Sequence, residues 1–252
     1  MKKCSMPEVV ISNITYVNTL PFRKGLASYQ FPEEFRVEIR EETPARCAEN
    51  LKNGSSDLGI VPVAAIREMQ DIEIVSDFCI ASQKEVRSVM LFSEVPLQDI
   101  SSVYLDYQSR TSVKLLQYLA REKWKKDFHW LAAGPGYENN IKGTTAGLII
   151  GDRALAMYDR FPYRYDMASE WHELTSLPFV FAVWAGKKNL PETFVTHFNH
   201  ALSAGISSLK TDAIKEQPAY PFDIVNYLQN NIYYSFDTNC KKAVSLFMQK
   251  AL

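Results

Sequence analysis

The chain has 252 residues, of which 46% are hydrophobic and 23% charged, and its formal net charge at pH 7 is −1. These values are typical of a globular protein with one or two domains and a sizeable core. A charge this close to zero predicts no long-range attraction to nucleic acid or to an anionic membrane, and no apolar run is long enough to span a bilayer.

The first residues favour a protein that stays in the cytoplasm. Two lysines are soon followed by Pro7 and Glu8, where a secretory signal would need an unbroken apolar segment. His197 and His200 lie three apart on a predicted helix with no acidic or cysteine partner nearby, so we predict no metal site. The four cysteines lack the spacing of metal ligands or redox motifs, as expected of reduced structural thiols. These are Cys4, Cys47, Cys79 and Cys240.

Strands and helices alternate from the N-terminus onward. A first strand at 8–14 leads to a helix that starts at Asn18 or Thr19, with Pro21 in its first turn, where a missing N–H does no harm. The alternating pattern of 35–40 predicts a half-exposed strand. The next predicted elements are a helix at 43–54, a strand at 58–62 that ends at Pro62, and a helix at 64–69.

The same alternation restarts between two strongly apolar runs, 89–92 and 179–185. Its predicted elements are strands at 103–106, 128–131 and 147–151, and helices at 109–124 and 152–158. We interpret the two apolar runs as strands that cross into and out of an inserted lobe. The first lobe then comprises residues 1–92 and 186–252, and the second lobe residues 93–185. The mostly helical tail after Trp184 should pack on the first lobe. The fold class is α/β, with a ligand cleft between two lobes.

The helix predicted at 109–124 begins with hydroxyl side chains and follows a short strand. Ser109, Thr111 and Ser112 lie where its cap and first turn should be. Free backbone N–H groups at such a helix start should face the crevice at the carboxyl end of the sheet, where they can bind an anion. Arg110 could add a planar pair of donors for a carboxylate. The alternative is an ordinary capped helix with Arg110 directed to water.

Other polar residues also stand at the ends of predicted strands, namely Asn18, Thr19, Ser88, Gly151 and Asp152. In a two-lobed protein these could converge on a small ligand rich in acceptors, which favours an organic acid. Asn18 could equally be a helix cap, an aspartate placed like Asp152 is more often a helix cap than a catalytic group, and Tyr16 and Phe179 could be core or cleft wall. Nucleotide-binding, serine-hydrolase and zinc-peptidase motifs are absent from the sequence.

Five segments resemble the motifs of the chorismate dehydratase family, MqnA, of the futalosine route to menaquinone. They are ITYVNTLPF at 14–22, RSVMLFS at 87–93, SRTSVKLL at 109–116, IGDRAL at 150–155 and LPFVFAVW at 177–184. The resemblance covers about the first three quarters of the chain. It implies the two-lobed fold of type II periplasmic binding proteins and a reaction that needs neither metal nor organic cofactor.

The resemblance also implies the reaction and its residues. Chorismate would lose water to give 3-[(1-carboxyvinyl)oxy]benzoate, with Asn18 and Ser88 against the reacting ring. The helix start from Ser109 to Ser112 would hold a carboxylate. The other substrate-binding residues implied are Tyr16, Thr19, Pro62, Arg110, Gly151 and Phe179. The general base is either Asp152 or the enolpyruvyl carboxylate of chorismate itself; we favour the second, because the matched positions are neutral donors.

The sequence departs from the family pattern at 144–148 and at Arg87, where glycine often precedes Ser-Val. An arginine beside the cleft would narrow it or add a carboxylate partner. One rival reading is a non-catalytic binding protein or sensor for a small carboxylate. Another is the sister enzyme 1,4-dihydroxy-6-naphthoate synthase, whose Ser-Pro-Cys-Pro-Asn-Asp opening is replaced here by TYVNT at 15–19. The oligomeric state, monomer or weak dimer, is left open by the sequence.

Overall fold

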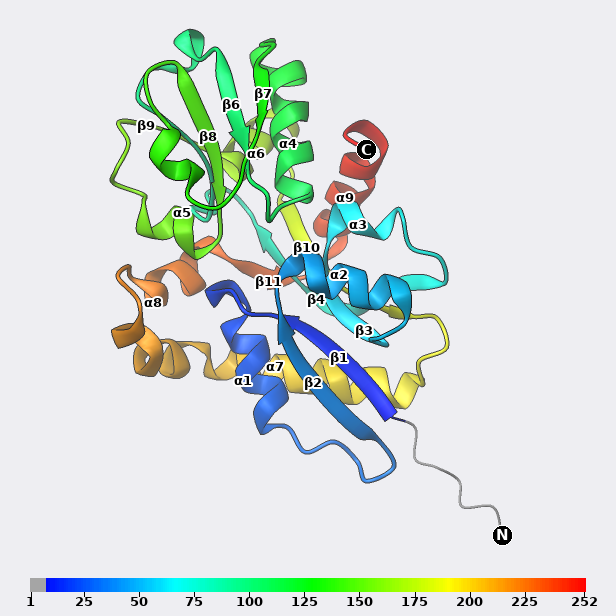
Figure 1. The fold of residues 1–252 in the computed structure, drawn as a ribbon. Coiled ribbons are helices and arrows are strands. Elements are labelled where there is room, and N and C mark those ends of the chain that lie inside the picture. Colours follow the sequence, from blue (N-terminus) through cyan, green and yellow to red (C-terminus); the bar gives the residue numbers. More distant parts are fainter. Residues whose placement is uncertain (1–7) are drawn as a thin grey trace.

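A computed structural model describes residues 8–252 as two α/β lobes, each built on its own sheet (Figure 1). Cys4 and most of the segment used to argue against export lie outside the described residues. Cys47, Cys79 and Cys240 are buried free thiols, as predicted. Between residues 8 and 252, no helix is both long enough and apolar enough to cross a membrane.

The first lobe is organised around a six-stranded sheet. In spatial order its strands are β11 (Tyr233–Ser235), β4 (Ile72–Ser82), β10 (Phe179–Lys187), β3 (Leu58–Pro62), β1 (Glu8–Ile14) and β2 (Arg36–Glu42). β1 runs parallel to β2 and β3, whereas β10 is antiparallel to β3 and β4. All residues of β3 are buried, which fits its unbroken apolar sequence in the middle of a covered sheet.

Helices cover this sheet and set its loops. They are α1 (Leu20–Ser28), α2 (Pro44–Asn53), α3 (Val63–Ile66), α7 (Glu192–Glu216), α8 (Ile224–Asn226) and α9 (Thr238–Lys250). α2 shows why local sequence fixes such boundaries. The Thr43 side chain accepts a hydrogen bond from the N–H of Arg46, Pro44 occupies the first turn, and Gly54 ends the helix at a φ of 79°.

The second lobe carries a five-stranded sheet. In spatial order its strands are β7 (His129–Ala132), β6 (Ser102–Leu105), β8 (Thr145–Ile150), β5 (Val89–Ser93) and β9 (Tyr163–Asp166). Its helices are α4 (Thr111–Leu119), which η3 (Ala120–Trp124) continues, α5 (Asp152–Ala156) and α6 (Met167–Thr175). Strand β4, strand β9, helix α6 and strand β11 are not predicted by the sequence patterns. β4 has register shifts against β10, and these interrupt the alternation on which a prediction depends.

The two apolar runs each belong to the sheet opposite to the one expected. β5 pairs with β8 and β9 in the second lobe, and β10 pairs with β3 and β4 in the first. Each run is apolar because side chains on both faces of the strand are buried. The chain instead crosses between the lobes at 83–88 and 176–178. The expected lobe boundaries at 92–93 and 185–186 are therefore displaced, because β5 belongs to the second lobe and β10 to the first.

The C-terminal tail packs on the first lobe and reaches the second. α7 lies against α1, and β11 adds an edge strand to β4. α9 packs on β10, where the ring of Phe247 lies 5.1 Å from that of Phe179 and 6.1 Å from that of Trp171 in α6. The tail therefore helps to hold the two lobes together.

Candidate functional site

A cavity that is partly open to solvent lies between the lobes where strands of both sheets end. Most of the predicted site residues line it. These are Tyr16, Asn18, Thr19, Pro62, Ser88, Ser109, Thr111, Ser112 and Gly151. The expected convergence of strand ends and helix starts from two lobes on one cavity is thus present in the fold.

The start of α4 brings three hydroxyl groups to the cavity wall. Ser109 Oγ accepts a hydrogen bond from the N–H of Ser112 at 3.0 Å and so caps the helix. Thr111 Oγ1 accepts from the N–H of Ala64, at the start of α3, at 3.1 Å. The Thr111 hydroxyl therefore joins the two lobes and keeps its own proton for another acceptor. This end of α4 also carries the positive end of the helix dipole, which favours an anion in the cavity.

The loop after β1 supplies the first-lobe side of the cavity. It forms η1 (Val17–Thr19) and runs directly into α1. The Thr19 hydroxyl is buried and donates to the carbonyl oxygens of Ile14 and Tyr16, so it mainly fixes this loop. The backbone oxygen of Asn18 accepts from Tyr234 Oη at 3.1 Å. Asn18 is thus held by its backbone at the cavity wall.

Ser88 stands at the crossing between the lobes, immediately before β5. The N–H of Ser88 bonds to the carbonyl of Val86 at 2.7 Å around Arg87, whose φ is +59°, a tight turn that glycine would adopt more easily. Asp166 Oδ2 secures the turn by accepting from the N–H groups of Val86 and Arg87 at 2.9 and 2.7 Å. The carbonyl of Ser88 accepts from the N–H of Gly151 at 2.8 Å, which joins this turn to the end of β8.

Arg87 itself does not narrow the cavity. Its Nε atom pairs with Glu85 Oε2 at 2.8 Å, and its guanidinium lies 5.1 Å from the ring centre of Tyr158. Neither expected effect of this departure from the family pattern is therefore seen. The other departure, at 144–148, runs into β8, where Thr144 bonds to Ser101 at 2.8 Å between their hydroxyls.

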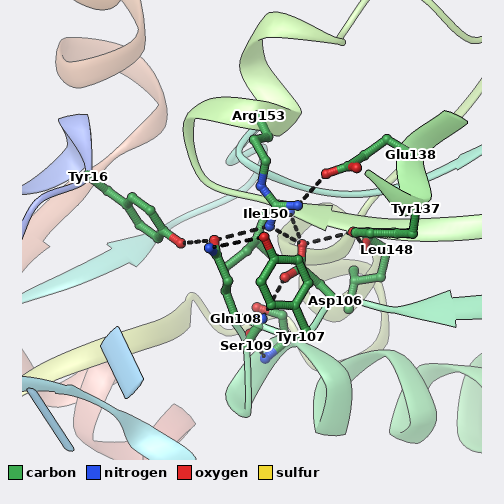
Figure 2. Close-up of polar contacts among 11 residues, drawn as sticks. Tyr16, Asp106, Tyr107, Gln108, Ser109, Tyr137, Glu138, Leu148, Ile150 and Arg153 are labelled. Atoms are coloured by element: carbon green, nitrogen blue, oxygen red, sulfur yellow. Dashed lines mark hydrogen bonds and ion pairs between the residues drawn. The ribbon is translucent and has the colours of Figure 1, made fainter. Parts of the chain in front are cut away.

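A polar network fixes the second-lobe side of the cavity against Tyr16 (Figure 2). Tyr16 Oη donates to Gln108 Oε1 at 2.7 Å, and Arg153 Nη2 donates to the same oxygen at 3.2 Å. Arg153 is held in turn by Glu138 and by Asp106, whose Oδ2 lies 2.7 Å from Nη2. Burial lowers the pKa of Arg153, but the neighbouring Asp106 and Glu138 outweigh it and raise this pKa overall. The guanidinium is therefore permanently charged and structural.

Tyr16 closes the cavity from the first lobe. Burial, followed by the charge of Asp106, raises the pKa of Tyr16 to about 12, so its phenol is a donor at neutral pH. Gly151 lies under the ring at a φ of +66°, and a Cβ there would meet the ring at 3.2 Å. Glycine is thus required for both the backbone conformation and the close approach of Tyr16.

Three predicted site residues lie outside the cavity wall. Arg110 is exposed and approaches Glu68 Oε2 at 3.5 Å, because its side chain leaves the first turn of α4 toward solvent. Phe179 is buried in the core against Trp171 and Phe247, and a register shift between Val180 and Ala182 turns Phe181 to the cavity instead. Asp152 Oδ1 accepts from the N–H of Val17 at 3.2 Å across the lobes, and burial raises its pKa.

Sequence reasoning missed Gln108 and Phe181, which line the cavity, and Tyr227, which contacts the cavity residue Ser88 from outside the wall. Gln108 is adjacent to Ser109, and its position between strand and helix was the available signal. Phe181 lies in the recognised segment 177–184, but the irregular register is not visible in the sequence. Tyr227 lies in the tail, outside every matched motif, and its phenol donates to Ser88 Oγ at 2.7 Å.

The cavity wall is more apolar than polar, and its polar groups carry no charge. Among residues 8–252, those that line it include no Asp, Glu, Lys, Arg or His. Its polar groups are amides, hydroxyls and the start of α4. The described residues also hold no group of three or more His, Cys, Asp or Glu arranged to bind a metal ion. Neutral donors aimed into a partly enclosed cavity can bind carboxylates and stabilise charge that develops during a reaction.

Known structures share the fold. A protein from Archaeoglobus fulgidus superposes with a TM-score of 0.76 at 12% identity, covering 97% of this chain and 96% of that one. The alkanesulfonate-binding protein SsuA from Xanthomonas axonopodis pv. citri superposes with a TM-score of 0.67 at 15% identity, covering 98% and 94%. These likenesses confirm the two-lobed periplasmic-binding-protein fold.

Sequence relatives are more specific. The chorismate dehydratase of Thermus thermophilus is 30% identical over 248 residues, covering 87% of this chain and 86% of the relative. The chorismate dehydratase of Campylobacter jejuni is 25% identical over 246 residues, covering 96% of each. The sequence model of the family described as menaquinone biosynthesis matches residues 9–252. This match includes the helical tail that the recognised motifs did not cover, and the chain therefore belongs to the menaquinone biosynthesis family.

Proposed function

We propose that this protein is a chorismate dehydratase, which removes water from chorismate to give 3-[(1-carboxyvinyl)oxy]benzoate in menaquinone biosynthesis. The observation that carries the proposal is the cavity lined by neutral donors from both lobes, in a chain of this family. Chorismate is a dianion, and an acidic lining would repel it. Hydroxyls and a helix start can bind its carboxylates and still leave them basic.

The reaction suits such a cavity. The ring C3–H is vinylogous to the ring carboxylate, so removing that proton spreads negative charge toward the carboxylate. The C4–O bond then breaks, the hydroxyl takes up the proton that was removed from C3 and leaves as water, and the ring becomes aromatic. Donors at the start of α4 would stabilise the charge on the ring carboxylate. Asn18 and Ser88 would orient the ring and the departing hydroxyl.

The proton from C3 goes, in our proposal, to the enolpyruvyl carboxylate of chorismate itself. The lining offers no carboxylate or imidazole in the described part of the chain. Asp152 is engaged at Oδ1 by the N–H of Val17, as expected of a residue that joins the lobes. The substrate's own carboxylate belongs to the enol ether that is bonded to C3, so it can reach the C3 proton without being positioned by a side chain.

The direct test is to incubate the purified protein with chorismate. We expect a product one water lighter by mass spectrometry, with the proton NMR signals of an aromatic ring. A binding protein with the same fold would instead retain chorismate unchanged. Saturable binding measured by calorimetry, with no aromatic product after long incubation, would show that the protein binds chorismate without converting it.

Asp152→Asn is expected to retain turnover within about tenfold of the wild type, because an amide oxygen can still accept from Val17. A general base would lose far more activity on this change. The measurement is kcat with chorismate, with the melting temperature as a control for the fold. A loss of several orders of magnitude in kcat, with binding and fold intact, would make Asp152 the base.

A further inference from the structure

Tyr227 lies behind the cavity wall and contacts Ser88, which lines the cavity. It begins η6 (Tyr227–Asn231), and its side chain is only 2% exposed. Its phenol donates to Ser88 Oγ at 2.7 Å. Tyr227 is not among the residues that line the cavity, so it would act on a ligand through the residues that it contacts, chiefly Ser88.

The direction of this hydrogen bond determines what Ser88 can do. Burial raises the pKa of Tyr227, against smaller lowering contributions from the side chains of Ser88 and Asn18, so the phenol stays protonated at neutral pH. A serine hydroxyl has one proton and two lone pairs. When Tyr227 fills one lone pair, the Ser88 proton is free for an acceptor in the cavity.

The segment that carries Tyr227 is well anchored. It continues into β11, where Tyr233 pairs with Ala81 of β4. The next residue, Tyr234, is 7% exposed and donates to the backbone oxygen of Asn18 at 3.1 Å. Two neighbouring parts of the tail therefore hold the two residues that face the reacting ring in the proposed function.

We propose that Tyr227 is a positioning residue, whose phenol fixes the rotamer of Ser88 and directs the Ser88 proton at the substrate. Its catalytic meaning rests on the proposed function. Without the phenol, Ser88 can rotate and satisfy itself elsewhere, and a donor that is slightly misplaced loses much of its effect on a transition state. The tail of the chain then belongs to the catalytic machinery, although it contributes no residue to the cavity wall.

The test is a double-mutant cycle of Tyr227→Phe and Ser88→Ala with chorismate as the substrate. Phenylalanine fills the same space, so the fold should be kept. We expect Tyr227→Phe to lower kcat about 10- to 100-fold with KM within about twofold. In the Ser88→Ala background the same change should have a much smaller effect, because Tyr227 acts chiefly through Ser88. Tyr29→Phe is the control, since its phenol bonds to His197 Nδ1 at 2.8 Å outside the site.

Two results would overturn the proposal. One is an unchanged kcat in Tyr227→Phe. The other is a Tyr227→Phe change that lowers kcat by the same factor in the wild type and in the Ser88→Ala variant. If the wild type does not convert chorismate at all, the proposed function fails separately. The same cycle is then measured as affinity for chorismate by calorimetry, where coupling between the two changes supports the positioning role and additivity rejects it.

Discussion

Ser109→Asp is expected to weaken chorismate binding by about 10²-fold or more without unfolding the protein. Aspartate is as good a helix cap as serine, so α4 should keep the bond that Ser109 Oγ makes to the N–H of Ser112. It also adds a negative charge where we place a substrate carboxylate. Two like charges about 4 Å apart near a protein surface repel by roughly 4 kcal/mol, and solvent reduces this at a half-buried position. The measurement is the dissociation constant by calorimetry, or KM.

Ser109→Asn is the matched control, because asparagine has the same size and also caps helices but carries no charge. We expect its affinity to stay within about tenfold of the wild type. Lowering the pH toward the pKa of the new carboxyl should recover binding in the Asp variant alone. Equal affinities of the Asp and Asn variants at neutral pH would mean that the start of α4 does not hold a carboxylate of the substrate.

Local chemistry made parts of this site predictable from the sequence. The cap of α4 at Ser109 and the start of α2 at Thr43 follow from side chains that bond to nearby backbone N–H groups, within three residues. Gly151 was found because it ends an apolar strand just before a helix. Such features depend on a few neighbouring residues, and the recognised motifs cover several of them. The fold was predicted as a whole from the same alternation and the family resemblance.

The missed features depend on contacts between distant parts of the chain. Tyr227 meets Ser88 across 139 positions of sequence. The choice between Phe179 and Phe181 is made by a register shift of β10 against β4, and no local pattern shows it. The sheet to which β5 and β10 belong is likewise decided by their partners, since an apolar run fits the centre of either sheet. Arg110 lies in the correct turn, but its rotamer directs it to Glu68 and solvent.

The two lobes are joined by several polar contacts that surround the cavity. Tyr16 bonds to Gln108, Val17 to Asp152, and Ala64 to Thr111. In each contact the first-lobe partner, Tyr16, Val17 or Ala64, belongs to a loop or helix start that also carries residues proposed to bind the substrate. The structure thus encloses the cavity with the same loops that line it. Exclusion of water in this way strengthens each neutral donor, which is how an uncharged site can stabilise a developing charge.

Gly205→Ala is expected to lower the free energy of unfolding by about 3 kcal/mol, the largest stability effect that we predict. Gly205 lies inside α7, where it crosses α1 at Gly25. A Cβ at Gly205 would lie 1.9 Å from the carbonyl oxygen of Pro21, and one at Gly25 would lie 2.1 Å from that of Ala201. Both obstacles are backbone atoms, so the helices themselves must separate. In an exposed helix the same change would stabilise by about 1 kcal/mol, so here the sign is reversed.

The melting temperature should fall by roughly 6–12 °C, as measured by circular dichroism or calorimetry. Gly134→Ala is the control, because no atom lies within 4 Å of a Cβ at that position, and we expect a change within about 1 kcal/mol. The change at Gly205 should also raise KM for chorismate, since Pro21 lies two residues after Thr19 at the cavity wall. A melting temperature equal to that of the wild type would show that α1 and α7 can move apart freely, and α1 could not then hold Asn18 firmly in place.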